Sequence, residues 1–497
     1  MIGEPTFTLG ETLLRLSPEL LLLAAGLLIL AVDALFPQGD AQEDEDLAWL
    51  PQAALTGLAA ALIATISLWG VNTPVLSVIS CDPFSLVVKM IALVAMGIVV
   101  LASDVYIRTR SEHQAEFYAL LLFSTLAICL LGAATNLIMV YLAFEFLSIT
   151  SYILTGFLRD DRHSAEAAIK YFLYGAAISA VMLYGMSWFY GLTGTTDLDG
   201  IAAALMNNTQ ASMRLALLPA LIFMVAGFAF KVGAVPFHQW APDAYEGAPT
   251  PVTAFLSVGP KIAGFAVIMR VLLTALPVDL VNLAMDWRAL LMAIAALTMT
   301  LGNLVAMWQT NIKRLLAYSS IAQAGYILVG VVAASPRGVA GVLLYLAAYA
   351  VTNLGAFAAI IAFSNQTGSD EIEDYAGMHK RAPVLALVMI VCLLSLAGIP
   401  PMAGFMGKLW IFSAAIDEGL LWLAVVGVVN SVISVSYYWK VIRAMYFTES
   451  QTEKPLPITP ALTIALGISV VGVLFVGMFP GPLMALLETA AQIFFAG

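Results

Sequence analysis

Runs of about 20 apolar residues recur along almost the whole of this 497-residue chain. A helix of that length crosses the hydrocarbon core of a bilayer, and a helix satisfies its own backbone hydrogen bonds in lipid. The runs predict one all-α transmembrane domain over residues 1–497 with about fourteen transmembrane helices. The expected spans are 19–36, 53–71, 84–103, 116–133, 136–157, 165–190, 214–237, 249–275, 289–307, 315–334, 338–363, 383–413, 420–442 and 459–479. A weaker amphipathic tail over 481–496 is expected to lie against the membrane or to extend the last span.

The composition excludes several other classes of protein. The chain is 61% hydrophobic and 11% charged, whereas soluble domains carry roughly 25% charged residues, so a water-soluble or disordered protein is excluded. The net charge of −11 argues against a nucleic-acid partner. Cys81, Cys129 and Cys392 form no CxxC pair, and the four histidines are scattered. We therefore expect no disulfide framework, no metal site and no redox cofactor in this chain.

The loop cations predict the orientation of the chain in the membrane. Ten of them fall in alternate loops: Arg108, Arg110, Arg159, Arg162, Lys313, Arg314, Lys380, Arg381, Arg443 and Lys454. The opposite loops hold only Arg15, Arg214, Arg288 and Arg337. The positive-inside rule then places the first set in the cytoplasm and both termini outside. The residues before the first span are acidic rather than basic, which is not typical of a cleaved signal peptide. We expect a multi-pass protein of a bacterial plasma membrane.

The remaining seven cations lie in or at the edge of apolar spans: Lys89, Lys170, Lys231, Lys261, Arg270, Lys408 and Lys440. A cation at the bilayer centre costs roughly 2.5–3.5 kcal/mol, so a chain without a use for them would carry apolar residues instead. Lys89 and Arg270 are off-centre and are expected to snorkel to the interface. Lys440 follows three aromatic residues and is interpreted as an interfacial anchor. Lys170 is expected within reach of Glu145 and is a secondary candidate for the site.

Glu145 and Lys261 lie near the centres of their spans. Ser148 and Tyr152 follow Glu145 at i+3 and i+7, which places polar groups on one helix face. The two readings for Glu145 are a role in ion movement and a structural hydrogen bond between helices. Lys261 directly follows a glycine and a proline, and its ammonium is too deep to snorkel easily. Its alternative is a purely structural role.

Lys231 and Lys408 adjoin two segments that are expected to break their helices. Gly233 and Pro236 follow Lys231, and three glycines and two prolines lie within the eleven residues that end at Lys408. Broken helices inside a membrane line a cavity or pack against protein, and corresponding breaks in two halves of a chain indicate a repeated transporter. The two broken spans run in opposite directions in the predicted topology, as in an inverted repeat. His238 is either near this site or merely interfacial.

These residues resemble the antiporter-like membrane subunits of respiratory complex I, and most closely its N subunits. The resemblance covers residues 15–480, and the block 230–249 is highly specific. The motifs that carry the resemblance are 145–152, 166–173, 230–249, 313–321 and the segment that ends at Lys408.

The resemblance implies two inverted five-helix repeats with broken helices 7 and 12. The implied divisions are a first repeat at 116–275, a second at 289–442, and flanking helices at 1–115 and 443–497. It also implies a translocase component of NADH:quinone oxidoreductase, with Glu145, Lys231, Lys261 and Lys408 as the proton path. Its implied partners are lipids and other membrane subunits, including neighbouring antiporter-like and small membrane subunits. NADH, FMN, iron–sulfur clusters and quinone are expected in partner subunits.

Two positions distinguish this chain among such relatives. Lysine at 408 favours the N or L type over M-type and cation-antiporter relatives, and 497 residues leave no room for the lateral helix of the L type. Gln323 stands where relatives often have histidine, so it can orient water but cannot titrate. We expect Glu145 to set the charge of Lys231, with quinone reduction elsewhere supplying the energy. The alternatives are a subunit of a Mrp-type cation/proton antiporter, a membrane-bound hydrogenase or ferredoxin-type complex, and a structural scaffold.

Overall fold

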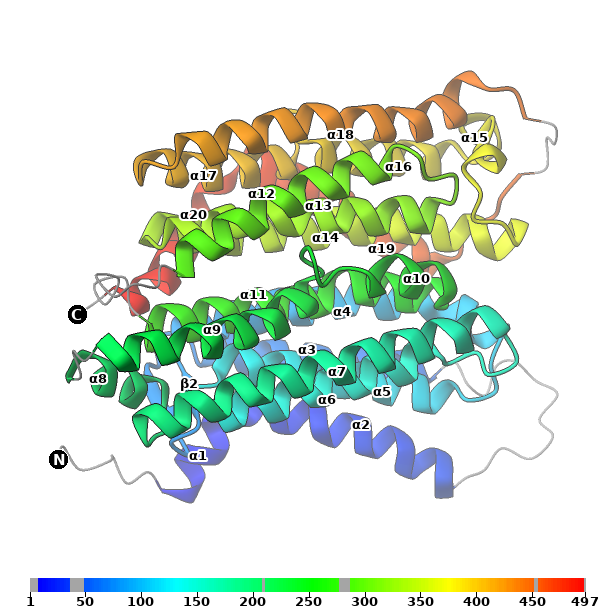
Figure 1. Cartoon of the computed structure of the whole chain (residues 1–497). Helices are drawn as coiled ribbons and strands as arrows, with labels where there is room; N and C mark the ends of the chain where they lie inside the picture. The colour runs from blue at the N-terminus through cyan, green and yellow to red at the C-terminus, as the bar shows by residue number, and fades with distance from the viewer. Residues whose placement is uncertain (1–7, 36–48, 208–210, 277–286, 451–454, 496–497) are drawn as a thin grey trace.

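A computed structural model describes residues 8–35, 49–207, 211–276, 287–450 and 455–495. Its helices lie side by side, nearly parallel or antiparallel to one axis, in a broad bundle that runs from α2 at one side to α18 at the other (Figure 1). The N-terminal elements are α1 (Leu9–Arg15), α2 (Ser17–Leu35), α3 (Trp49–Ser67), β1 (Thr73–Val75), β2 (Ile79–Cys81) and α4 (Pro83–Arg108). The two strands form an antiparallel hairpin.

The middle of the chain consists of α5 (Gln114–Ala133), α6 (Leu137–Thr155), α7 (Arg162–Thr193), α8 (Leu198–Asn207), α9 (Ala211–Val232), α10 (Trp240–Gly247) and α11 (Thr250–Ala275). The last part consists of α12 (Trp287–Ala306), α13 (Ile312–Ala333), α14 (Pro336–Thr367), η2 (Ile372–Tyr375), α15 (Met378–Arg381), α16 (Pro383–Ala397), α17 (Ala403–Asp417), α18 (Leu421–Phe447), α19 (Pro460–Met478), α20 (Pro480–Ala491) and η3 (Gln492–Phe494).

The structure confirms the multi-pass helical membrane architecture. Among the described residues, twelve helices are long and apolar enough to cross a membrane. Of the two other expected spans, 214–237 contains most of α9 and ends in the interruption before α10, and 383–413 is divided between α16 and α17. The count of fourteen crossings, the repeat boundaries and the sidedness of the membrane stay predictions. The helices α1 and α20 lie at the same end of the bundle (Figure 1).

Sequence reasoning did not anticipate the hairpin, α1 or α8. All three are short, so they lack the long apolar run that signals a span. A local signal does exist for α1, because Thr8 and Glu11 form a capping box at its start. The tail expected over 481–496 is a helix, α20, that packs against α14 and α4.

The helix α9 ends just before a glycine, Gly233, which begins the interruption before α10. Gly233 has a φ of +73°, a left-handed conformation that glycine adopts without the steric cost of a Cβ atom. The amide of Ala234 donates to the carbonyl of Ala229 at 2.7 Å, and that of Gly233 donates to Phe230 at 3.0 Å. This pair of bonds is the Schellman motif that closes many helices.

The interruption after α16 has the same backbone pattern. Gly398 has a φ of +86°. The amide of Ile399 donates to Leu394 at 3.1 Å, and that of Gly398 donates to Ser395 at 2.9 Å. In both interruptions the third residue after the glycine is a proline that follows a cis peptide bond. The two helices are therefore ended by the same local device, as the sequence predicted from glycine and proline.

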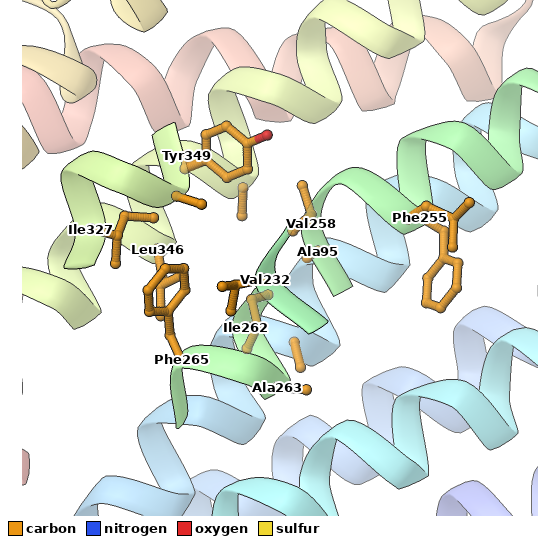
Figure 2. Close-up of a cluster of buried hydrophobic side chains, with 14 of the residues drawn as sticks. Ala95, Val232, Phe255, Val258, Ile262, Ala263, Phe265, Ile327, Leu346 and Tyr349 are labelled. Carbon is orange, nitrogen blue, oxygen red and sulfur yellow. The ribbon is translucent and has the colours of Figure 1, made fainter. Parts of the chain in front are cut away.

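Three helices, α11, α13 and α14, form the interior of the bundle. All of α11 except Thr274 is buried, and α13 and α14 are buried over most of their lengths. Figure 2 shows part of this interior, where Val232 of α9 and Ile262 and Phe265 of α11 lie near Ile327 of α13 and Leu346 of α14. The candidate lysines are therefore held in well-packed apolar surroundings away from lipid.

Candidate functional site

Lys231, at the end of α9, is the first buried cation of the site. It is 1% exposed, and its Nζ donates to the Ser148 hydroxyl at 2.8 Å and to the Phe144 carbonyl at 3.2 Å. Both acceptors belong to α6, on either side of Glu145. In the described part of the chain the buried Glu145 oxygen Oε1 has no hydrogen-bond partner, and the carboxylate lies close enough to Lys231 to interact electrostatically with its ammonium. The structure thus brings Glu145 and Lys231 together without a direct bond between them.

Lys261 projects from α11 to the interrupted end of α9. Its Nζ donates to the carbonyl of Val232 at 2.7 Å and to that of Ser320, in α13, at 2.8 Å. Val232 is the last residue of α9, where carbonyls lack partners within the helix and the helix dipole is negative. A Cβ atom built on Gly233 would lie 3.9 Å from this ammonium. Lys261 therefore caps the broken helix from outside.

Lys408 occupies the same position at the other interruption. Its Nζ donates to the carbonyls of Leu396 and Ala397, the last two residues of α16, at 3.2 and 3.0 Å. The ammonium lies 4.6 Å from the ring centroid of Tyr326, an arrangement that stabilises a cation. Lys408 is 4% exposed.

Polar groups of α13 lie between Lys261 and Lys408. Ser320 accepts from Lys261, and Gln323 lies one turn further along α13. The Gln323 amide nitrogen donates to the Leu396 carbonyl at 3.0 Å, which is also an acceptor for Lys408. Gln323 is 1% exposed. Its amide therefore binds, inside the bundle, the same Leu396 carbonyl that accepts from Lys408.

Four tyrosines bind Ser320 or Gln323, and sequence reasoning missed them. Tyr349 donates to the Ser320 hydroxyl at 2.9 Å, and the Tyr245 hydroxyl lies 3.2 Å from the same oxygen. Tyr345 donates to the Gln323 oxygen, and Tyr438 accepts from its nitrogen at 3.3 Å. Their sequence positions resemble those of ordinary core aromatics, so no local signal separates them from packing residues.

The expectation that Lys170 reaches Glu145 is wrong. Lys170 is about half exposed and forms ion pairs with Glu166 at 2.8 Å and with Asp243 of α10 at 3.1 Å. Lys170 pairs with these carboxylates at the partly exposed end of the bundle, because an ion pair at that position avoids the cost of burying the ammonium. His238 lies between α9 and α10 and is partly exposed.

The expectation that Lys89 and Arg270 snorkel to the interface is wrong, because both side chains form buried ion pairs. Lys89 is 2.6 Å from Glu19, and Arg270 makes two contacts with Asp82, at 2.8 and 3.0 Å. All four side chains are buried. No local pattern predicts these pairs, because each joins segments far apart in the chain. In each pair the buried carboxylate compensates the charge of the buried cation.

Short ionic contacts hold α10, the second half of the first interrupted helix. Arg314 of α13 lies 2.8 Å from Asp243 and 2.6 Å from Glu246. Lys313 donates to the carbonyl of Ala248, just after α10, at 3.0 Å. We call the group of Glu166, Lys170, Asp243, Glu246 and Arg314 the α10 ion cluster.

The site as a whole is a row of buried lysines, hydroxyls and one amide near the two interruptions. Within the described ranges, no group of three histidine, cysteine or acidic residues is placed to hold a metal ion. The three lysines can exchange a proton at Nζ, and the hydroxyls and the amide can each donate and accept a hydrogen bond.

The family model described as NADH:quinone oxidoreductase/Mrp antiporter, transmembrane, matches residues 134–434. The NADH-quinone oxidoreductase subunit N of Heliobacterium modesticaldum is 44% identical over 444 residues, which cover 89% of this chain and 92% of that protein. A chain of respiratory complex I from Thermus thermophilus has a TM-score of 0.78 and 30% identity, covering 94% of this chain and 98% of its own.

A chain of the Mrp complex from Dietzia has a TM-score of 0.81 at 23% identity, covering 98% of both chains. At that identity the likeness concerns the fold alone. The family match and the similarity to subunit N agree with the buried lysine row. The chain therefore belongs to the family of transmembrane proteins that comprises NADH:quinone oxidoreductase subunits and Mrp antiporter subunits.

Proposed function

We propose that this chain is the N-type subunit of a respiratory NADH:quinone oxidoreductase in a bacterial plasma membrane. It carries protons along Glu145, Lys231, Lys261 and Lys408, and quinone reduction in partner subunits drives the transfer. The observation that carries the proposal is the set of polar groups on α13 between the two lysines: the Ser320 carbonyl accepts from Lys261, and Gln323, one turn further, binds the Leu396 carbonyl that also accepts from Lys408. A protein that used these lysines only for packing would not need polar groups between them.

The surroundings of Lys231 suggest how the proton is released. A carboxylate stabilises a nearby ammonium, whereas burial favours the neutral amine. Moving Glu145 away from Lys231 therefore favours loss of the proton, and a difference of one pKa unit corresponds to about 1.36 kcal/mol. Because Lys231 is bonded to Ser148 and Phe144 rather than to Glu145, a small movement of the carboxylate can change its charge.

The outward face of α6 supports an assembly of several subunits. Glu145 is partly exposed and lies in a stripe with Ile138, Leu142, Ile149 and Ile153, which are each at least half exposed. A carboxylate on an apolar face at mid-membrane depth is costly in lipid. A partner subunit that covers the stripe removes this cost, which favours the complex over a stand-alone antiporter.

The test is Lys231→Ala in the assembled complex, measured in membrane vesicles. Without the exchangeable ammonium, proton pumping and coupled quinone reduction should fall by roughly 100-fold, the scale of a lost acid–base group. Lys440→Ala is the control, because Lys440 is also a lysine but binds the Gln309 carbonyl away from this row.

Normal turnover with normal pumping in the Lys231→Ala complex would reject the proposal. Reconstitution of the chain alone separates the alternative, because cation/proton exchange without partners would instead indicate an antiporter.

A further inference from the structure

Two tyrosines between Lys231 and the α10 ion cluster have hydroxyls that packing does not explain. Tyr152 of α6 is 8% exposed and Tyr171 of α7 is 1% exposed. Neither phenol oxygen has a hydrogen-bond partner of normal geometry within the described part of the chain, although the Tyr152 hydroxyl lies close to that of Ser148 and the Tyr171 hydroxyl close to that of Ser151. Buried polar groups in folded proteins nearly always bond to protein or to ordered water. A phenylalanine at either position would fill the same space without this cost.

The inner tyrosine adjoins the lysine site. Tyr152 lies one helical turn after Ser148, which accepts from the Lys231 ammonium at 2.8 Å. The Tyr152 hydroxyl packs directly against Gly175 of α7, and a Cβ atom on that glycine would overlap the phenol oxygen. The glycine thus leaves room for a hydroxyl between the two helices.

The outer tyrosine continues from the inner one to the end of the bundle. The rings of Tyr152 and Tyr171 meet edge to face, with centroids 4.7 Å apart. Tyr171 also stacks on Trp240, the first residue of α10, at 4.3 Å and 10°. The next residue before Tyr171 is Lys170, which pairs with Asp243. In Figure 1, α10 lies near α7, and the two helices pack against each other.

We propose that the hydroxyls of Tyr152 and Tyr171 hold water molecules that pass protons between the α10 ion cluster and Lys231. The inference rests on the proposed function and adds the route by which one end of the row communicates with the surface. Each hydroxyl accepts one proton as it donates another, so both phenols stay neutral. The transferred proton ends on the Nζ of a neutral Lys231, or leaves from the ammonium in the opposite direction.

The test is Tyr152→Phe and Tyr171→Phe, each in the full assembled complex. Both changes keep the ring contacts, including the stack on Trp240, and remove only the hydroxyl. Coupled quinone reduction and pumping should fall by about fivefold, which corresponds to one lost hydrogen bond in the transfer step. The thermal stability of the complex should stay the same or rise, because an unpartnered buried hydroxyl is removed.

Tyr375→Phe is the matched control. Tyr375 is also fully buried with an unpartnered hydroxyl, and its ring stacks on Phe363 at 3.8 Å. It lies in η2, away from Lys231, so its loss of a hydroxyl should leave pumping unchanged. Equal losses in this control and in the two test variants would show a general effect of buried tyrosines and overturn the proposal.

The remaining outcomes also decide the matter. Wild-type pumping in both Tyr152→Phe and Tyr171→Phe would overturn the proposal that these hydroxyls help to pass protons. Failure of both complexes to assemble would also overturn it, since that result would assign the hydroxyls a structural role. If the tyrosine variants pump normally while Lys231→Ala abolishes pumping in the same experiment, only the role of the tyrosines is rejected. If Lys231→Ala pumps normally, the proposed function itself fails.

Discussion

The interruption between α9 and α10 and the one between α16 and α17 share a backbone but differ in their charges. Each begins at a left-handed glycine, Gly233 or Gly398, and each exposes carbonyls that a lysine ammonium binds. At the first interruption that lysine, Lys261, comes from a neighbouring helix. At the second, Lys408 comes from the other half of the same broken helix. The two interruptions thus have the same helix-ending backbone, but the lysine that binds the free carbonyls comes from a different position in the fold in each.

The first interruption has an additional cation and a carboxylate. Lys231 ends α9, and Glu145 lies beside it on α6. Lys408 is instead steadied by the Tyr326 ring and by the carbonyl that it shares with Gln323. We infer that the charge of Lys231 can be altered by moving a carboxylate, whereas the charge of Lys408 depends on proton delivery along the row.

The largest expected effect tests what the two interruptions share. Lys261→Met and Lys408→Met each remove an exchangeable ammonium while keeping most of the side-chain volume. Pumping in vesicles should fall by roughly 100-fold in both variants. A complex that pumps normally with methionine at either position would show that the two interruptions are not equivalent.

Glu145→Gln tests the difference between the interruptions. The amide keeps the shape of the side chain but no longer stabilises the Lys231 ammonium, so pumping should fall by about tenfold, the equivalent of one pKa unit. The measurement is the pumping rate across a range of pH. An unchanged rate at every pH would show that Lys231 does not depend on its carboxylate.

Gln323→Leu tests the shared carbonyl at the second interruption. The buried hydroxyl of Tyr345 loses its acceptor, which should lower the free energy of unfolding by roughly 1–3 kcal/mol. Pumping should fall by about fivefold, as expected for one hydrogen bond. Gln323→Glu is a useful companion, since it keeps an acceptor for Tyr345. Wild-type pumping with leucine would indicate that the row does not pass through this position.

The smallest expected effect compares the two glycines. Alanine at either position costs roughly 1–2 kcal/mol in a left-handed conformation. A Cβ atom on Gly398 would lie 2.9 Å from the Lys408 side chain, whereas the nearest atom to one on Gly233 is 3.9 Å away. Gly398→Ala should therefore also slow pumping by a factor of about two, because Lys408 must shift from its carbonyls. Gly233→Ala should lose stability alone, and equal pumping losses in the two variants would contradict the comparison.

Much of the site could be predicted because cations in apolar spans are conspicuous. Glu145, Lys231, Lys261 and Lys408 were found from depth and neighbouring helix breakers, and the structure places all four inside the bundle or at its α6 face. Lys170 was assigned the wrong partner because the sequence does not show that the short helix α10 brings Asp243 to it.

The class of fold and the positions of both helix breaks follow from the amino-acid sequence alone. Hydropathy, glycine and proline act over a few residues, so they can be recognised without knowledge of the fold. The groups that the cations contact depend instead on how the helices pack: Glu19 for Lys89, Asp82 for Arg270, and helix-end carbonyls for Lys261 and Lys408. Such partners join segments far apart in the chain, and they are chosen by packing that brings whole helices together rather than by any local pattern.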